Sequence, residues 1–144
     1  MIEWRQGSSS VVANVPDDSF VVRFGGKKFK ADDLMARALT HYMETKGKEF
    51  GLSVNTLPGK SADEIAAIAE RPNPQFRFTT AREIRAIGLD FSDEIDDYGH
   101  TNVIFPDPPT TKHFQDFAEI FATVRNNPNP VTPRERKDAP HDER

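Results

Sequence analysis

Cysteine is absent from the 144 residues of this sequence. Without thiols the chain has no disulfide framework, no thiolate nucleophile and none of the cysteine ligands that hold structural zinc. The four histidines do not show the spacing of a zinc site, so we expect no metal. An excess of basic residues is also absent, since the net charge at pH 7 is −4. This balance argues against general affinity for nucleic acid, which depends on clustered Lys and Arg.

Long hydrophobic runs are missing too. No apolar stretch approaches the roughly 20 residues that a helix needs to span a bilayer. The N-terminus does not show a basic segment followed by an apolar one, and the apolar segment over residues 11–15 is too short for a signal peptide. We therefore expect a soluble cytoplasmic protein that does not associate with a membrane.

Aromatic residues are mostly phenylalanine: the chain has eleven Phe, two Tyr and one Trp. Each buried aromatic ring removes about 150–250 Å² from water, so the phenylalanines can build one small core.

Composition divides the chain into three parts. We expect a flexible N-terminal arm over residues 1–18, a globular domain over residues 19–125 and a disordered tail over residues 126–144.

Short stretches rich in Val, Ile and Phe, bounded by Gly, Pro or Asp, predict strands. The predicted strands cover residues 20–24, 52–55, 75–79 and 101–105, with a shorter one near 89–91. Apolar spacing and capping boxes predict helices over residues 32–46, 61–70, 80–87 and 111–124. Because the strands alternate apolar and polar residues, we expect a single α+β domain with a mixed or mainly antiparallel sheet and packing helices.

Three short apolar stretches carry an unexpected polar residue: Arg23 in residues 19–24, Ser53 in residues 51–55 and His100 in residues 100–105. Successive side chains of a strand point to opposite faces, so these residues point away from their apolar neighbours. None of the outward strand residues is Lys or Glu: they are Arg23, Ser53, Asn55, Arg77, Thr79, His100 and Asn102. Arg, Ser, His and Asn can hold and polarise a charged ligand if they share one face. The alternative is the ordinary solvated face of a half-buried antiparallel sheet.

The order of short motifs over about residues 19–125 is informative. A strand-borne Arg is followed by Gly-Leu-Ser-Val, Ile-Gly-Leu, Gly-His-Thr-Asn-Val-Ile-Phe-Pro and an apolar helix. This order resembles that of small bacterial ADP-ribosyltransferase-like toxins. The resemblance implies an ADP-ribosyltransferase-like fold, NAD as a substrate, and activity as an NAD-dependent ADP-ribosyltransferase or NAD glycohydrolase. It also implies a cognate antitoxin or immunity protein as a partner.

The same resemblance implies roles for individual residues. Arg23 would hold the phosphates of the dinucleotide, with Arg77 and Asn102 as further binding residues. Ser53 and His100 would be the catalytic pair beside the nicotinamide ribose, where His100 contacts a ribose hydroxyl or moves a proton.

The chain departs from that family in one respect. Many of these enzymes place a Glu on a strand to stabilise the oxocarbenium-like transition state, and no predicted strand here contains one. The nearest candidates are Glu49, just before the second strand, and Glu119 on the last helix. Relatives that resemble RNA 2′-phosphotransferases work with Arg and His pairs and without this Glu, which suits Arg23, Arg77 and His100.

An acidic loop supports a different function. Five carboxylates fall within eight residues, without the spacing of a calcium loop: Asp90, Asp93, Glu94, Asp96 and Asp97. The loop is either solvated or a docking surface for a basic partner. The alternative to an enzyme is therefore a non-catalytic interaction module, an antitoxin, immunity protein or accessory subunit, that uses this loop and the termini. The basic cluster at residues 134–137 is the only feature that favours a nucleic-acid-associated protein.

A hydrolase triad can also be assembled on paper from Ser53, His100 and Asp96 or Asp97. Ser53 lacks the Gly-x-Ser-x-Gly turn that exposes such a nucleophile, which argues against this assignment.

Overall fold

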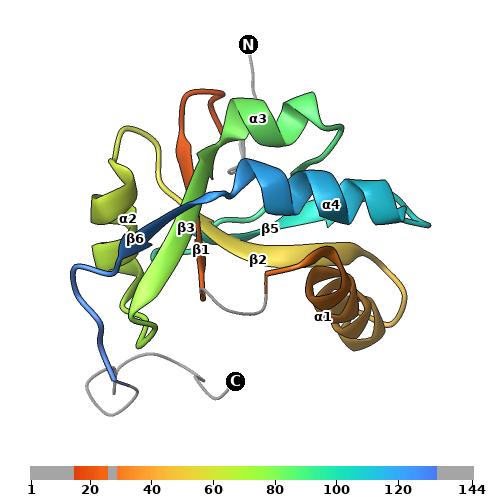
Figure 1. Cartoon of the computed structure of the whole chain (residues 1–144), viewed down its shortest axis with the longest axis horizontal. Coiled ribbons are helices and arrows are strands. Elements are labelled where there is room, and N and C mark those ends of the chain that lie inside the picture. Colours follow the sequence, from red (N-terminus) through yellow and green to blue (C-terminus); the bar gives the residue numbers. More distant parts are fainter. Residues whose placement is uncertain (1–14, 26–28, 133–144) are drawn as a thin grey trace.

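The structure is a computed structural model that describes residues 15–25 and 29–132. Within these residues it contains six strands and four helices (Figure 1). The strands are β1 (Phe20–Phe24), β2 (Phe50–Thr56), β3 (Gln75–Thr80), β4 (Asp90–Phe91), β5 (His100–Phe105) and β6 (Thr123–Asn126). The helices are α1 (Ala31–Glu44), α2 (Ala62–Ala69), α3 (Ala81–Ala86) and α4 (Thr111–Ile120). Residues 1–14 and 133–144, which include the basic cluster at 134–137, lie outside the described residues.

The six strands form one sheet in the order β4-β5-β2-β1-β3-β6. All of its pairings are antiparallel, which confirms the expected α+β class with an antiparallel sheet. The longest ladders join β2 to β5 and β1 to β3, so residues far apart in the sequence lie side by side at the centre of the sheet.

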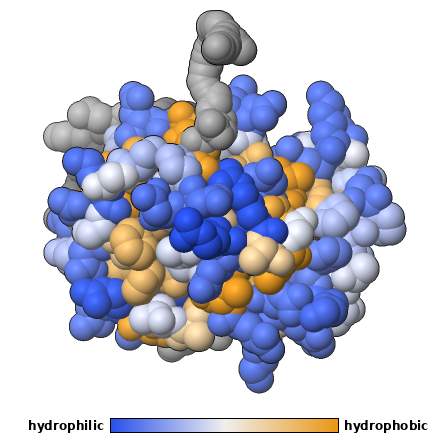
Figure 2. All heavy atoms as spheres, turned by 90° about the horizontal axis from the view of Figure 1, so that it is seen from above, coloured by the Kyte–Doolittle hydropathy of each residue, from blue (hydrophilic) through white to orange (hydrophobic). Residues whose placement is uncertain are grey.

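Hydrophobic residues cover both faces of the sheet. On one face Leu52, Val54 and Val103 belong to the larger core, which α1, α3 and α4 complete. On the other face Val22 and Phe76 pack against α2 through a smaller core. Figure 2 shows the side of the molecule that carries α3, where hydrophobic residues form separate small areas between hydrophilic ones.

The apolar stripe of α4 is confirmed. Phe114, Phe117 and Phe121 are each 0% exposed. Their rings stack in sequence with the end of β5, because the centroids of Phe105 and Phe114 lie 4.5 Å apart and those of Phe117 and Phe121 lie 4.6 Å apart. These contacts hold α4 across the larger core.

The C-terminal end of the domain differs from the expectation. The last helix ends at Ile120, and Thr123–Asn126 form β6, which pairs with β3. Asn127 was expected to lie in a disordered tail, but it is 6% exposed and its amide donates to two backbone carbonyls of the segment before β3. Helical spacing extended the helix to Val124 because a strand pairing with a distant segment leaves no local pattern.

The N-terminal boundary also differs. The flexible arm was expected to reach residue 18, but Val15 is 1% exposed and belongs to the larger core. The Asp17 carboxylate accepts a hydrogen bond from Arg85 Nη1 at 2.6 Å, and the Asp17 carbonyl accepts one from the Arg82 amide at 2.9 Å. Residues 15–18 are therefore part of the domain.

Helix α1 buries only one of its sides. Leu34 and Ala38 are buried, as the spacing predicts. Leu39 and Met43 are 48% and 69% exposed, although the apolar spacing of this helix also includes them. The helix packs on β2 and α4 from one side, so its other side faces solvent.

Candidate functional site

Strands β1 and β2 share a ladder over only a short length. They pair at Val21 with Thr56 and at Val22 with Asn55, whereas β2 pairs with β5 at six positions. Beyond these pairs the two strands run in different directions (Figure 1). We define the fork as the divergent parts of these strands, residues 23–24 of β1 and 50–54 of β2. Backbone groups of β2 that face the fork have no β1 ladder partner, so other groups must satisfy them.

Arg23 fills this requirement. Its Nη1 donates a hydrogen bond of 2.6 Å to the backbone carbonyl oxygen of Ser53. The side chain is half-buried and reaches across the fork from β1 to β2. This hydrogen bond joins Arg23 to Ser53, two of the predicted site residues.

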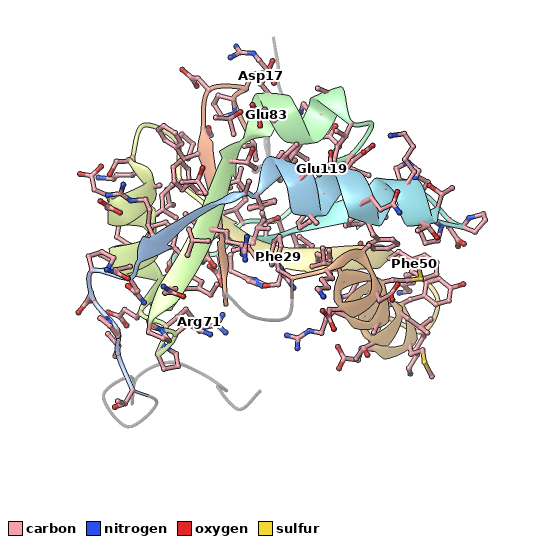
Figure 3. The ribbon with its side chains drawn as sticks, viewed as in Figure 1. Asp17, Phe29, Phe50, Arg71, Glu83 and Glu119 are labelled. Atoms are coloured by element: carbon pink, nitrogen blue, oxygen red, sulfur yellow. The ribbon has the colours of Figure 1, made fainter. Side chains whose placement is uncertain are left out.

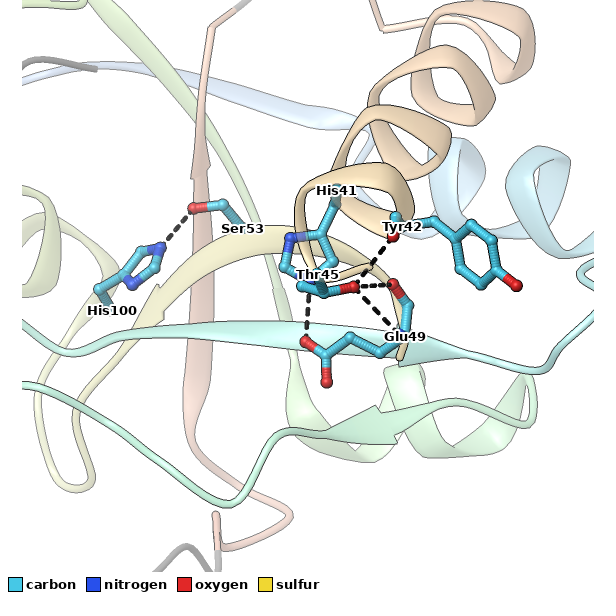
Figure 4. A network of polar contacts seen from close by, with 6 residues as sticks. All are labelled: His41, Tyr42, Thr45, Glu49, Ser53 and His100. Atoms are coloured by element: carbon cyan, nitrogen blue, oxygen red, sulfur yellow. Dashed lines mark hydrogen bonds and ion pairs between the residues drawn. The ribbon is translucent and has the colours of Figure 1, made fainter. Parts of the chain in front are cut away.

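Ser53 is also joined to His100. Its Oγ lies 2.8 Å from Nε2 of the imidazole, and the tautomer of the ring decides which of the two donates (Figure 4). The β2–β5 register explains the contact, because Ser53 lies opposite Asn102 and His100 lies opposite Asn55, which makes Ser53 and His100 diagonal neighbours on one face. Arg23, Ser53 and His100 thus form one continuous hydrogen-bonded chain.

The expectation that all outward polar residues share one face is wrong. Val22 lies opposite Asn55, so the apolar face of β1 continues into the polar face of β2. Arg23 is consequently on the face opposite to the side chains of Ser53 and His100. A shift of one residue in register exchanges the two faces, and alternation within single strands cannot reveal it. The site forms nevertheless, because Arg23 uses the carbonyl of Ser53 in the plane of the sheet and not its hydroxyl.

Arginines gather around Arg23. Arg77 lies directly opposite it on β3, and Arg37 and Arg71 lie near enough to repel it electrostatically. Burial, followed by repulsion from Arg37 and Arg71, lowers the pKa of Arg23 to about 10. Within residues 15–25 and 29–132, no carboxylate forms an ion pair with Arg23 or Arg37. Two neighbouring guanidinium groups that form no ion pair with a carboxylate, those of Arg23 and Arg37, fit a bound anion.

Two of these arginines contact aromatic rings. The Arg71 guanidinium lies 5.6 Å from the ring centroid of Phe24, the last residue of β1, and Figure 3 shows it at that end of the sheet. The Arg77 guanidinium lies 4.5 Å from the centroid of Phe29, and its Nη1 donates to the carbonyl of Phe121 at 3.3 Å. Arg77 therefore braces the end of α4 as well as adding positive charge beside Arg23.

The remaining outward residues differ in position. Asn102 lies opposite Ser53 on the same face and is half-buried, so it adjoins the Ser53–His100 pair. Asn55 donates from Nδ2 to the carbonyl of Tyr98 and holds the turn before β5. Thr79 donates to the Glu83 carboxylate. Asn55, opposite His100, and Asn102, opposite Ser53, therefore both adjoin the pair, and Thr79 does not.

A second histidine, His41 of α1, contacts a carboxylate beside the start of β2. His41 Nε2 is 2.7 Å from Glu49 Oε2, and the backbone amide of Glu49 is held by the hydroxyl of Thr45 (Figure 4). The His41 ring covers Gly51: a Cβ at Gly51 would lie 3.2 Å from its Cδ2 and Nε2. The local sequence pattern around His41 did not indicate this contact. The signal was Gly51 itself, because a glycine inside a strand marks a close approach.

An open hollow of about 680 Å³ begins at Glu49 and follows β4 and the acidic loop. Most of its polar lining consists of carboxylates, from Glu49, Asp90, Asp93 and Glu94. Most of the remaining lining is apolar, from Phe91, Ile104, Phe105 and Pro106. The hollow therefore combines negative charge with an apolar surface.

Two further acidic candidates are placed elsewhere. Asp96 Oδ1 accepts the backbone amides of Tyr98 and His100 at 2.9 Å each, so this carboxylate caps the turn before β5. Glu119 is exposed on α4 (Figure 3). Of the two glutamates considered in place of a strand-borne one, Glu49 is the one near β2, because its partner His41 lies against Gly51 of that strand.

Comparison with known proteins finds no matching family model, no matching curated protein and no matching solved structure. In the part of the chain that the structure describes, no helix has the length and apolarity to cross a membrane. Over the same residues, no group of three or more metal-ligating side chains could hold a metal ion.

Proposed function

We propose that the protein is a small bacterial toxin or effector with an ADP-ribosyltransferase-like fold, and that the fork binds a nicotinamide dinucleotide as substrate. The observation that carries this proposal is the chain of contacts from Arg23 through Ser53 to His100, together with the absence of an ion-paired carboxylate at Arg23 and Arg37 among the described residues. Arg23 contacts the backbone of Ser53 from one face of the sheet, and the hydroxyl–imidazole pair lies on the other face, so a bound dinucleotide would pass through the fork between them.

The arginines suit the pyrophosphate. A guanidinium presents a planar set of donors that matches phosphate oxygens, and it stays charged at neutral pH even when burial lowers its pKa to about 10. A dianionic pyrophosphate would relieve the repulsion that Arg37 and Arg71 exert on Arg23. Arg23 also has donors beyond the one used for the Ser53 carbonyl. Arg77 and Asn102 would border the bound molecule.

The Ser53–His100 pair suits the nicotinamide ribose. A hydroxyl and an imidazole held 2.8 Å apart can both donate to and accept from ribose hydroxyls. The reaction breaks the bond between C1′ of this ribose and the nicotinamide nitrogen, and positive charge develops on the sugar. Transfer of the ADP-ribosyl group to a target gives an ADP-ribosyltransferase, and transfer to water gives an NAD glycohydrolase.

Calorimetric titration with NAD tests the proposal. We expect saturable binding to the wild type and a loss of about 10- to 100-fold in affinity for Arg23→Gln, since a charge-assisted hydrogen bond contributes about 1.5–3 kcal/mol. Arg82→Gln is the matched control, because Arg82 is an exposed arginine on α3. A folded wild-type protein that binds no NAD at millimolar concentration refutes the proposal.

Expression in bacteria tests the biological part. We expect the wild type to arrest growth and Arg23→Gln or His100→Ala to relieve the arrest at equal protein level. A cognate antitoxin or immunity protein should then restore growth when produced from the same cell. Harmless expression of folded wild-type protein would contradict a toxin.

The acidic hollow favours a second candidate function. Its carboxylates and apolar residues fit a basic partner protein, as expected of a non-catalytic antitoxin, immunity protein or accessory subunit. In that case Asp93→Asn with Glu94→Gln would weaken partner binding, while Arg23→Gln would leave it unchanged. Substitutions in the acidic hollow should therefore affect only partner binding, and substitution of Arg23 should affect only NAD binding.

A further inference from the structure

We propose that His41 and Glu49 supply the general base of this site, with His41 as the catalytic residue and Glu49 as the residue that positions it. The inference rests on the proposed function, because it assigns the group that accepts a proton from the attacking nucleophile. It also addresses the absence of a glutamate from the described strands.

The placement follows from the absence of a side chain at Gly51. Gly51 and Ser53 are two positions apart on β2 and therefore face the same side, about 7 Å from each other along the strand. The His41 ring fills the space above Gly51, within 3.2 Å of where its Cβ would lie. This places an imidazole from α1 in the side-chain row of β2, one position before Ser53 and its partner His100.

Glu49 sets the state of the ring. Its carboxylate is 2.7 Å from His41 Nε2, and the two side chains are 30% and 22% exposed. A carboxylate accepts only, so a neutral His41 carries its hydrogen on Nε2 and offers Nδ1 as the proton acceptor. Thr45 holds the backbone amide of Glu49, which fixes the start of β2 beneath the pair. The hollow lined by Glu49 opens to solvent, so water has access to this side.

The chemical step balances with water as the co-reactant. The C1′–N bond of NAD breaks, and nicotinamide leaves with the bonding electron pair. The oxygen of water forms a bond to C1′, and one of its protons passes to Nδ1 of His41, whose imidazolium the Glu49 carboxylate stabilises. The products are ADP-ribose, nicotinamide and one proton, which His41 returns to solvent. An acceptor hydroxyl in place of water would react by the same step.

Nicotinamide release by the full chain, measured with NAD binding by calorimetry, tests the assignment. We expect His41→Ala to lower kcat by about 10²–10⁴-fold, the usual contribution of a general base, with the NAD dissociation constant unchanged. Added imidazole should restore part of the lost kcat. Glu49→Gln should also lower kcat while leaving KM unchanged, because the amide still fills the position but no longer selects the tautomer.

Gly51→Ala provides a variant that removes no functional group. Its methyl would lie 3.2 Å from the His41 ring and 3.3 Å from the Val103 carbonyl oxygen, so the ring must shift by a few tenths of an ångström. We expect a kcat loss smaller than that of His41→Ala, without a loss of NAD binding. The matched control is Ala36→Gly on the exposed side of α1, which should keep the wild-type kcat. Wild-type kcat in His41→Ala, a parallel loss of binding and kcat, or no response to imidazole overturns the base assignment alone. Failure of the wild type to bind NAD overturns the proposed function and this inference with it.

Discussion

Replacing Arg23 with methionine separates the electrostatic cost of this residue from its structural contribution. Burial and the neighbouring arginines lower the pKa of Arg23 from its ordinary value to about 10, so the folded state disfavours the charged form by about 3 kcal/mol. Its charge-assisted bond to the Ser53 carbonyl contributes about 1.5–3 kcal/mol in the opposite direction. Because methionine keeps an unbranched apolar side chain, we expect Arg23→Met to change the free energy of unfolding by no more than about 1.5 kcal/mol at pH 7.

The pH dependence has a defined sign. At pH 7 Arg23 is charged in both the folded and unfolded states, so the full cost is present. As the pH rises through about 10, folded Arg23 loses its proton before unfolded Arg23 does. The wild type therefore gains stability relative to Arg23→Met above this pH.

Urea unfolding of both proteins, at pH 7 and at about pH 11, measures this difference. Ile65→Ala, at a fully buried site in the smaller core, should cost about 2–5 kcal/mol and calibrates the assay. A loss of 3 kcal/mol or more for Arg23→Met at pH 7 would mean that Arg23 is mainly a structural anchor. The reasoning that a ligand anion must offset its charge would then be incorrect.

Three further outcomes follow from individual contacts. A double-mutant cycle with Ser53→Ala and His100→Ala should give a coupling energy of about 1 kcal/mol in urea unfolding, since the 2.8 Å hydrogen bond joins two partly buried groups. Additive effects of the two substitutions would show that this hydrogen bond is not formed. Phe117→Ala should lower the free energy of unfolding by about 3–5 kcal/mol, because its ring is 0% exposed, and a loss below 1 kcal/mol would contradict its place in the core. Arg125→Gln should raise the pKa of Asp63 towards its ordinary value, because the hydrogen bonds from Arg125 are the main cause of the lowered pKa. An NMR titration of the Asp63 carboxyl group that shows no change in pKa would contradict this contact.

Local patterns predicted most elements of this fold. The capping box from Ser61 to Glu64 predicted the start of α2, and both of its reciprocal bonds are present. Alternation predicted which residues of β5 face the same way, with Thr101, Val103 and Phe105 buried on one side. These features depend on neighbours within four residues, so the sequence records them directly.

The site was only partly predictable for the same reason. The sequence singled out Arg23, Ser53 and His100 as polar residues in apolar strands, and in the structure Arg23 and His100 each form a hydrogen bond with Ser53. It did not indicate that Arg23 would use a backbone carbonyl, because that contact depends on where the β1–β2 ladder stops. The His41 contact with Gly51 was missed because it joins α1 to β2 through an absent side chain.

The sequence alone therefore determined the α+β class, the helix starts and the polar residues from which a site could form, because periodicity and capping are local. Only the tertiary structure decided the strand order, the exchange of faces between β1 and β2, and the use of residues 123–126 as an edge strand. Each of these depends on pairing between segments distant in sequence, where one residue of register moves every side chain to the other face. The fork, and with it the candidate site, arises where that long-range pairing ends.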